Sequence, residues 1–134
     1  MVSLAPLGLP VDDGLGLLSA LTEQGTEVLA AGWIRVIDDD RYLLCIVTEP
    51  GRNNLLEQYH AVGDTLRSLA PTRVRLDEVN ILRPDEPLGA GLIQLRRLYP
   101  GVNTAVFAAS SVGRVGVQGP VVLYPVSPIL TPTA

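Results

Sequence analysis

The segment that most constrains the fold is Val28–Val47, in which two apolar runs flank a short acidic break. The runs are Val28–Ile37 and Tyr42–Val47; both are rich in β-branched and aromatic residues, and Asp38–Asp40 between them has turn chemistry. This pattern predicts a β-hairpin. Both faces of the first run are mostly apolar, and strands of this kind are covered on both faces of their sheet. We therefore expect the hairpin at the centre of the fold, with helices on at least one face. The side chains predicted to be buried are Trp33, Ile34, Leu44 and Ile46.

Helices are predicted over three ranges, 12–24, 54–70 and 86–98. Either of the two aspartates at positions 12 and 13 can cap the first helix. The second helix has the strongest apolar periodicity in the chain, and Asn54 forms a capping-box pattern with Glu57 at its start. Arg96 and Arg97 fall in the last turn of the third helix, where the helix dipole favours cations.

The remaining apolar segments predict strands over 72–82, 103–108, 112–117 and 121–124. A change of phase at Glu78 fits a β-bulge or a strand that crosses between two environments. The last two segments predict a second hairpin that turns at Gln118–Gly119. The order helix, two strands, helix, strand, helix, three strands predicts an α+β fold, in which three helices pack on a mostly antiparallel sheet of five or six strands.

Residues 12–124 are expected to form a single domain, since a chain of 134 residues has the usual length of one domain. An extended N-terminal arm, 1–11, precedes this domain, and a proline-bearing C-terminal tail, 125–134, follows it. The first residues lack the basic region and the unbroken apolar core of a signal peptide. No window approaches the roughly 18 consecutive apolar residues of a membrane span. We expect a cytoplasmic protein that does not contact a membrane.

The low charge of the chain favours association with a protein partner. Charged residues make up 18% of the sequence, against roughly 25% in an average domain, so fewer charges cover the surface. The alternative is a large core beneath uncharged polar residues. The net charge of −4 creates no positive field for a phosphate backbone, so nucleic-acid binding is not expected. All ten basic residues are arginine, which fits GC-rich coding in a bacterium.

The glycine-rich segment 110–119 is the first candidate site. Glycine lets backbone N–H groups approach a phosphate, and an arginine within the segment adds positive charge. The spacing is not that of a Rossmann or P-loop motif, and the glycines of a closely packed hairpin explain it as well. The ligand-binding candidates are Ser110, Ser111, Gly113, Arg114 and Gly116, with Arg83 as a further contributor.

Two other patterns offer weaker sites. Asp38–Asp40 carry oxygen ligands for a hard cation, but adjacent side chains of a strand point to opposite faces and rarely converge. Gly89 and Gly91 lie near a predicted helix start that could bind an anion, although Asp85 and Glu86 would repel one there. We therefore expect no metal or cofactor site.

Cys45 is the single cysteine and His60 the single histidine, so an internal disulfide is excluded. The two could act as nucleophile and base if the second helix packs on the central hairpin, although nothing in their spacing requires it. The sequence favours a small non-catalytic protein that acts through protein–protein contact, as a homo-oligomer or as a subunit of a complex. The alternatives are a small-ligand-binding or phosphate-binding domain using segment 110–119, and an enzyme built on Cys45 and His60.

Overall fold

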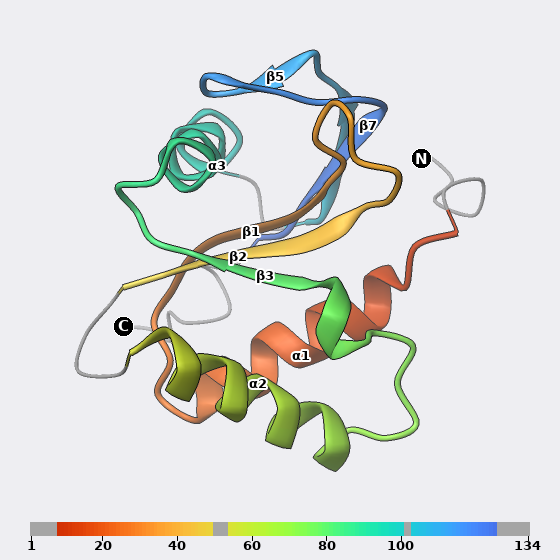
Figure 1. Cartoon of the computed structure of the whole chain (residues 1–134), viewed down its shortest axis with the longest axis vertical. Coiled ribbons are helices and arrows are strands. Elements are labelled where there is room, and N and C mark those ends of the chain that lie inside the picture. The colour runs from red at the N-terminus through yellow and green to blue at the C-terminus, as the bar shows by residue number, and fades with distance from the viewer. Residues whose placement is uncertain (1–7, 50–53, 101–102, 126–134) are drawn as a thin grey trace.

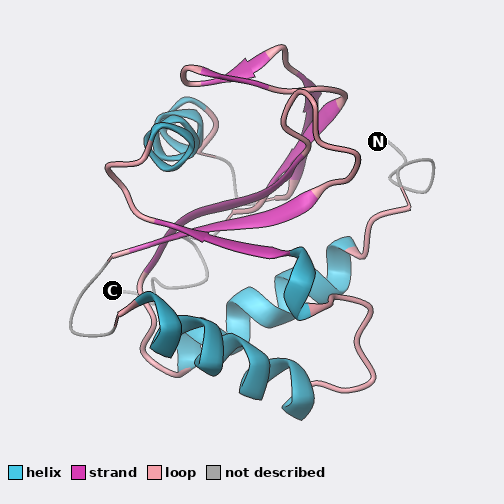
Figure 2. Ribbon diagram, in the orientation of Figure 1, coloured by secondary structure: helices cyan, strands magenta, loops and turns pink. Residues whose placement is uncertain are grey.

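A computed structural model describes residues 8–49, 54–100 and 103–125 and shows a sheet with helices on both faces (Figures 1 and 2). The helices are α1 (Val11–Glu23) and α2 (Leu55–Ser68) on one face and α3 (Pro87–Leu98) on the other. The main sheet consists of β1 (Val28–Ile34), β2 (Leu43–Thr48), β3 (Val79–Leu82), β4 (Ala105–Ala108) and β7 (Pro120–Leu123). A separate small hairpin contains β5 (Ser111–Val112) and β6 (Val115–Gly116). The predicted α+β fold and its element order are confirmed.

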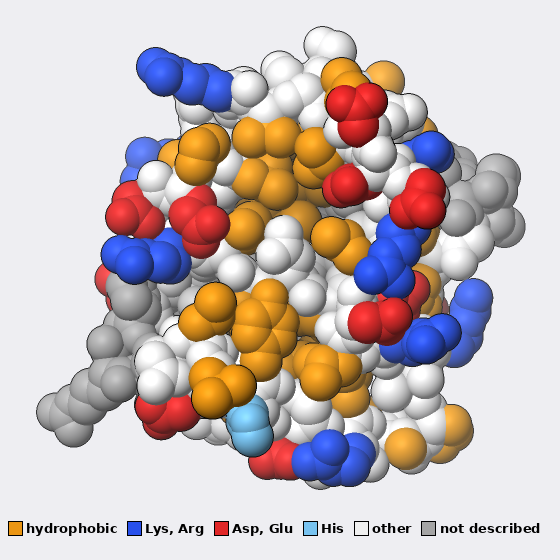
Figure 3. Space-filling view, viewed as in Figure 1, with side chains coloured by type: hydrophobic (Ala, Val, Ile, Leu, Met, Phe, Trp, Pro, Cys, Tyr) orange, Lys and Arg blue, Asp and Glu red, His pale blue; other side chains and the backbone are white. Residues whose placement is uncertain are grey.

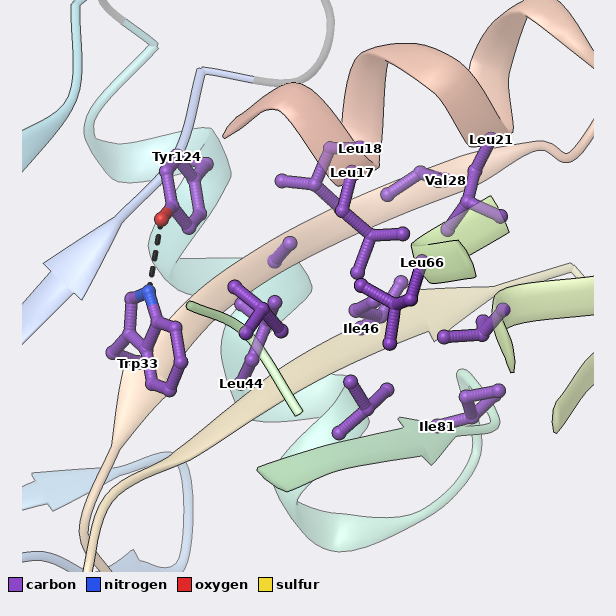
Figure 4. Close-up of a cluster of buried hydrophobic side chains, with 14 of the residues drawn as sticks. Leu17, Leu18, Leu21, Val28, Trp33, Leu44, Ile46, Leu66, Ile81 and Tyr124 are labelled. Carbon is purple, nitrogen blue, oxygen red and sulfur yellow. Dashed lines mark hydrogen bonds between the residues drawn. The ribbon is translucent and has the colours of Figure 1, made fainter. Parts of the chain in front are cut away.

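The β1–β2 hairpin lies at the centre of the sheet, as predicted. Helices cover both of its faces, and the four side chains expected to be buried are each at most 1% exposed. The register shifts between Val28 and Ala30, so Val28 packs under α1 and α2 while Ala30 packs under α3. Two hydrophobic cores result, one on each side of the sheet, and Figure 4 shows the core beneath α1 and α2.

The sheet is mixed rather than wholly antiparallel. Its strand order is β3-β2-β1-β7-β4, in which β2 and β3 run parallel and the other neighbours run antiparallel. Helix α2 connects the two parallel strands, as a crossover connection requires. Consequently β3 and β4 are the two edge strands.

Two predicted strand features are wrong. The strand expected over 72–82 begins at Val79, because Leu76–Glu78 form a short 3-10 helix that accounts for the change of phase at Glu78. The expected hairpin of 112–117 with 121–124 does not form. Instead Gly113, at φ 62°, turns the chain early so that β5 pairs with β6, and β7 inserts between β1 and β4.

Helix boundaries follow the sequence signals at all but one point. Asn54 caps α2 by accepting a hydrogen bond from the Glu57 backbone N–H at 2.8 Å, as its capping-box pattern predicts. Helix α1, in contrast, has Pro10 at its N-cap position and no side-chain cap. Asp13 instead accepts a hydrogen bond from the backbone N–H of Arg73, which ties the start of α1 to a distant loop.

Most of the predicted arm and tail, 1–7 and 126–134, lies outside the described residues. Within the described part of the chain, no helix has the length and apolar character needed to cross a membrane.

Candidate functional site

The glycines of segment 110–119 have a packing role. A Cβ atom on Gly91 of α3 would lie 2.7 Å from the backbone nitrogen of Gly113, so helix and hairpin approach backbone to backbone. Gly116 similarly faces Ile37, whose Cδ1 would lie 2.8 Å from an added Cβ. Ser110, Ser111 and Arg114 are exposed, and among the described residues no hydrogen bond joins their side chains. Phosphate binding by this segment stays a prediction. Packing accounts for its glycines, and its polar side chains do not indicate a binding site.

Cys45 and His60 lie on opposite sides of the sheet. The thiol belongs to the core under α3, whereas α2, which carries the exposed His60, packs on the other face. Burial, partly offset by a hydrogen bond from Asn80, raises the pKa of Cys45 to about 12. The thiol is therefore protonated at neutral pH, and the nucleophile–base pair considered as an alternative from the sequence is not formed.

The structure explains Asp38–Asp40 as a turn between β1 and β2. Asp38 adopts φ 80°, and Arg35 Nε donates to the Asp39 carbonyl oxygen at 3.0 Å. Within the described residues no group of three metal-ligating side chains could hold an ion.

Gly89 is required by close packing, not by an anion. A Cβ there would overlap the carbonyl oxygen of Arg83, and the Glu86 carboxylate accepts the Arg83 backbone N–H at 2.7 Å. The Arg83 guanidinium pairs with Asp85 at 3.4 Å. This end of α3 is therefore already occupied by its own carboxylates.

A buried polar chain links Trp33, Tyr124 and the start of α1 (Figure 4). Trp33 Nε1 donates to the Tyr124 hydroxyl at 2.8 Å, and that hydroxyl donates to the Val11 carbonyl oxygen at 2.6 Å. Both side chains are fully buried, and burial raises the pKa of Tyr124. Each polar side-chain atom in this series of hydrogen bonds has a partner within the protein, so the cluster is structural.

An open cleft of about 530 Å³ lies beside this start of α1, lined by Gly8–Asp13 and Arg73. Asp13, one of its two carboxylates, is already bonded to the Arg73 backbone. The cleft therefore offers few free polar groups to fix a ligand.

The far end of α3 differs, because exposed apolar side chains and an unpaired charge meet there. Leu98 is 66% exposed and Tyr99 51% exposed. The Tyr99 ring stacks on Phe107 of β4, with ring centroids 4.8 Å apart. Among the described strands β4 pairs with β7 alone, so no described strand lies along its outer edge. We call Leu98, Tyr99 and strand β4 the β4 surface.

Arg96 lies in the last turn of α3, three residues before Tyr99. It is 8% exposed, its Nη1 donates to the Tyr99 carbonyl oxygen at 3.2 Å, and its Nε has no hydrogen-bond partner. No ion pair of the described residues includes it. Glu86, the nearest preceding acidic residue, lies ten residues earlier, or about 15 Å along the helix. A buried guanidinium without a carboxylate is unusual, since buried charges are normally paired.

The sequence that follows the start of α3 offers Arg96 no acidic partner. All 14 Asp and Glu residues lie in residues 1–86, whereas residues 87–134 contain three arginines and no acidic residue. The C-terminal third of this acidic protein is therefore locally basic. This asymmetry is visible in the sequence and could have indicated the site.

A second apolar area lies over α2 (Figure 3). Leu55 and Leu56 in the first turn of α2 are 52% and 67% exposed. Leu76, which lies beside Gly63 farther along α2, is 45% exposed. Figure 3 also shows hydrophobic side chains gathered between α3 and the loop that joins β1 to β2. Neither area contains a buried polar side-chain atom without a partner, or an open strand, among the described residues, so neither indicates what would bind there.

The predicted ligand-binding residues are thus not the ones that stand out in the structure.

Comparison with protein-family models, with curated proteins and with solved structures finds no match for this chain.

Proposed function

We propose that this chain is a non-catalytic cytoplasmic protein that acts through protein–protein contact, and that the β4 surface is its binding site. The observation that carries the proposal is the combination of an open strand edge with adjoining exposed apolar side chains. An unpaired edge presents backbone N–H and C=O groups that can pair with another strand. Leu98, Tyr99 and Phe107 provide apolar area beside that edge.

The opposite edge of the sheet lacks this combination. The Tyr59 hydroxyl accepts the backbone N–H of Ile81 in β3 at 2.9 Å, so a side chain occupies part of that edge. Charged residues follow β3 directly, at Arg83 and Asp85. Charges and side-chain cover are the usual protection of edge strands. Strand β4 contains no charged residue, and within the described part of the chain no side-chain hydrogen bond covers its outer edge.

The test compares two matched double variants in purification from native lysate. Leu98→Ser with Tyr99→Ser removes the apolar side chains of the β4 surface, whereas Leu55→Ser with Leu56→Ser removes a similar exposed area from α2. We expect the first variant to lose the proteins that co-purify with wild type, and the second to retain them. If the two variants retain the same proteins, or if wild type is a monomer that captures none, the proposal is wrong.

A further inference from the structure

The direction of the backbone groups in β7 determines which residues of β4 are already paired. Tyr124, directly after β7, donates its backbone N–H to the Ala31 carbonyl oxygen of β1 at 2.9 Å. Backbone groups alternate in direction along a strand of an antiparallel sheet, so those of Leu123 and Val121 face the opposite way, toward β4. Every second residue of β7 is therefore directed at β4.

Two residues of β4 consequently present their backbone groups on its outer side. Leu123 and Val121 of β7 pair with Ala105 and Phe107 of β4. By the same alternation, the N–H and C=O groups of the other two residues of the strand, at positions 106 and 108, point away from β7. No described strand lies along that side. A strand that joined the sheet there would bond to these two residues.

A strand that joins the sheet at this edge must be apolar on both faces. Val106 packs against the core under α1 and α2, Phe107 packs against the core under α3, and both side chains are half-buried. Side chains of an added strand would cover their exposed parts, one on each face. Strand β4 has this character itself. Residues 98–113 contain no charged side chain, so pairing β4 with a copy of itself opposes no like charges within this segment.

On these grounds, and resting on the function proposed above, we propose that the partner of the β4 surface is a second copy of this chain, and that the two β4 strands pair antiparallel about a twofold axis. One register uses both outward-facing residues of each strand: Val106 pairs with Ala108 of the second copy, and Ala108 with its Val106. The two Phe107 residues then lie opposite each other on the α3 side. Such a twofold arrangement is the commonest form of self-association.

Apolar side chains beside the strand would add to the interface. Leu98 is 66% exposed and Tyr99 51% exposed, and the Tyr99 ring stacks on Phe107, the residue at the axis. Two strands of four residues bury little area by themselves, and small interfaces are weak. We therefore expect a dimer that forms at about 100 µM protein and dissociates on dilution to about 1 µM.

The test is an exchange of charges at Ala108, an exposed position at the edge. In the proposed register the two Ala108 side chains are diagonal neighbours across the axis, at the roughly 7–8 Å over which long side chains interact. We expect Ala108→Glu and Ala108→Arg each to weaken self-association about tenfold, because like charges meet, and an equimolar mixture of the two to associate as tightly as wild type. Sedimentation velocity of the full-length proteins measures this.

Two further variants separate strand pairing from general damage. Leu56→Glu places the same charge in the exposed apolar area of α2 and should dimerise like wild type. Ala108→Pro removes an N–H that points outward, a position at which an edge strand tolerates proline, so it should abolish dimerisation without unfolding the protein. Circular dichroism of each variant establishes that it is folded.

The proposal is overturned if wild type remains a monomer at the higher concentration, if folded Ala108→Pro still dimerises, or if the mixture of the two charged variants associates no better than either alone. It is also overturned if Leu56→Glu dissociates the dimer as strongly as Ala108→Glu. A monomeric wild type that captures other proteins from lysate, and loses them in Leu98→Ser with Tyr99→Ser, would exclude the second copy while the proposed function stands.

Discussion

Arg96 is a buried charge whose removal is expected to stabilise the folded protein. A guanidinium that is buried without a carboxylate loses its hydration and gains little in return, and here one N–H also lacks a partner. Arg96→Met keeps the length of the side chain and removes the charge. We expect it to raise the free energy of unfolding by about 1 kcal/mol, measured by urea denaturation.

The matched control is Arg97→Met, because Arg97 is exposed and its replacement should change the free energy by less than about 0.5 kcal/mol. A clear loss of stability in Arg96→Met would contradict the interpretation. It would mean that the Tyr99 hydrogen bond and the helix dipole together outweigh the cost of burying the charge.

At the scale of elements, the contact between α3 and the β5–β6 hairpin depends on glycine. A Cβ on Gly91 would lie 2.7 Å from backbone atoms of Val112 and Gly113, which cannot move aside as a side-chain end could. We expect Gly91→Ala to lower the free energy of unfolding by about 2 kcal/mol, in the range of overpacked cores. Thermal or urea unfolding measures the change.

Gly16→Ala provides the control, since Gly16 is also helical and an added Cβ there would meet nothing within 4 Å. That variant should be stabilised by up to about 1 kcal/mol, because alanine is the better helix former. If both variants are stabilised, α3 and the hairpin do not approach as closely as described. The packing explanation of Gly113 would then be lost, and the phosphate-binding alternative would gain support.

Elements with local signals could be predicted from the sequence, and their non-local pairings could not. The β1–β2 hairpin and α2 carry their own periodicity and cap, so their existence followed from a few adjacent residues. The insertion of β7 between β1 and β4 depends on residues about 90 positions apart. The burial of Arg96 escaped prediction for the same reason: its position in the last turn of α3 fits a surface cation, and the sheet beneath is assembled from distant segments.

Across the whole molecule, the two edges of the sheet differ in their charge and in the side chains that cover them. Tyr59 and the charges after β3 protect one edge, while β4 at the other edge is short, uncharged and bordered by exposed apolar side chains. The acidic residues are likewise confined to residues 1–86. The uncovered edge and the charge distribution are therefore the two reasons for proposing a binding site in the part of the molecule that follows α3 and not on α2.

Stability of the whole protein should fall at alkaline pH because acidic groups are buried in both cores. Burial raises the pKa of Cys45 from 9.0 to about 12 and that of Tyr124 above its ordinary value of 10.0. Above pH 9 the unfolded thiol therefore releases its proton while the folded thiol keeps it. The unfolded state then binds fewer protons, so the free energy of unfolding decreases by up to about 1.4 kcal/mol per pH unit for each such group.

The contribution of the thiol can be isolated, because it begins to titrate one pH unit below the tyrosine. Urea unfolding of wild type and Cys45→Ala at pH 8, 9, 10 and 10.5 gives the two slopes. We expect Cys45→Ala to be less stable at pH 8, through loss of packing, but to lose stability more slowly between pH 9 and 10. Equal slopes would show that Cys45 ionises in the folded protein. The core under α3 would then be open to solvent at β2, which would revive Cys45 as a reactive group.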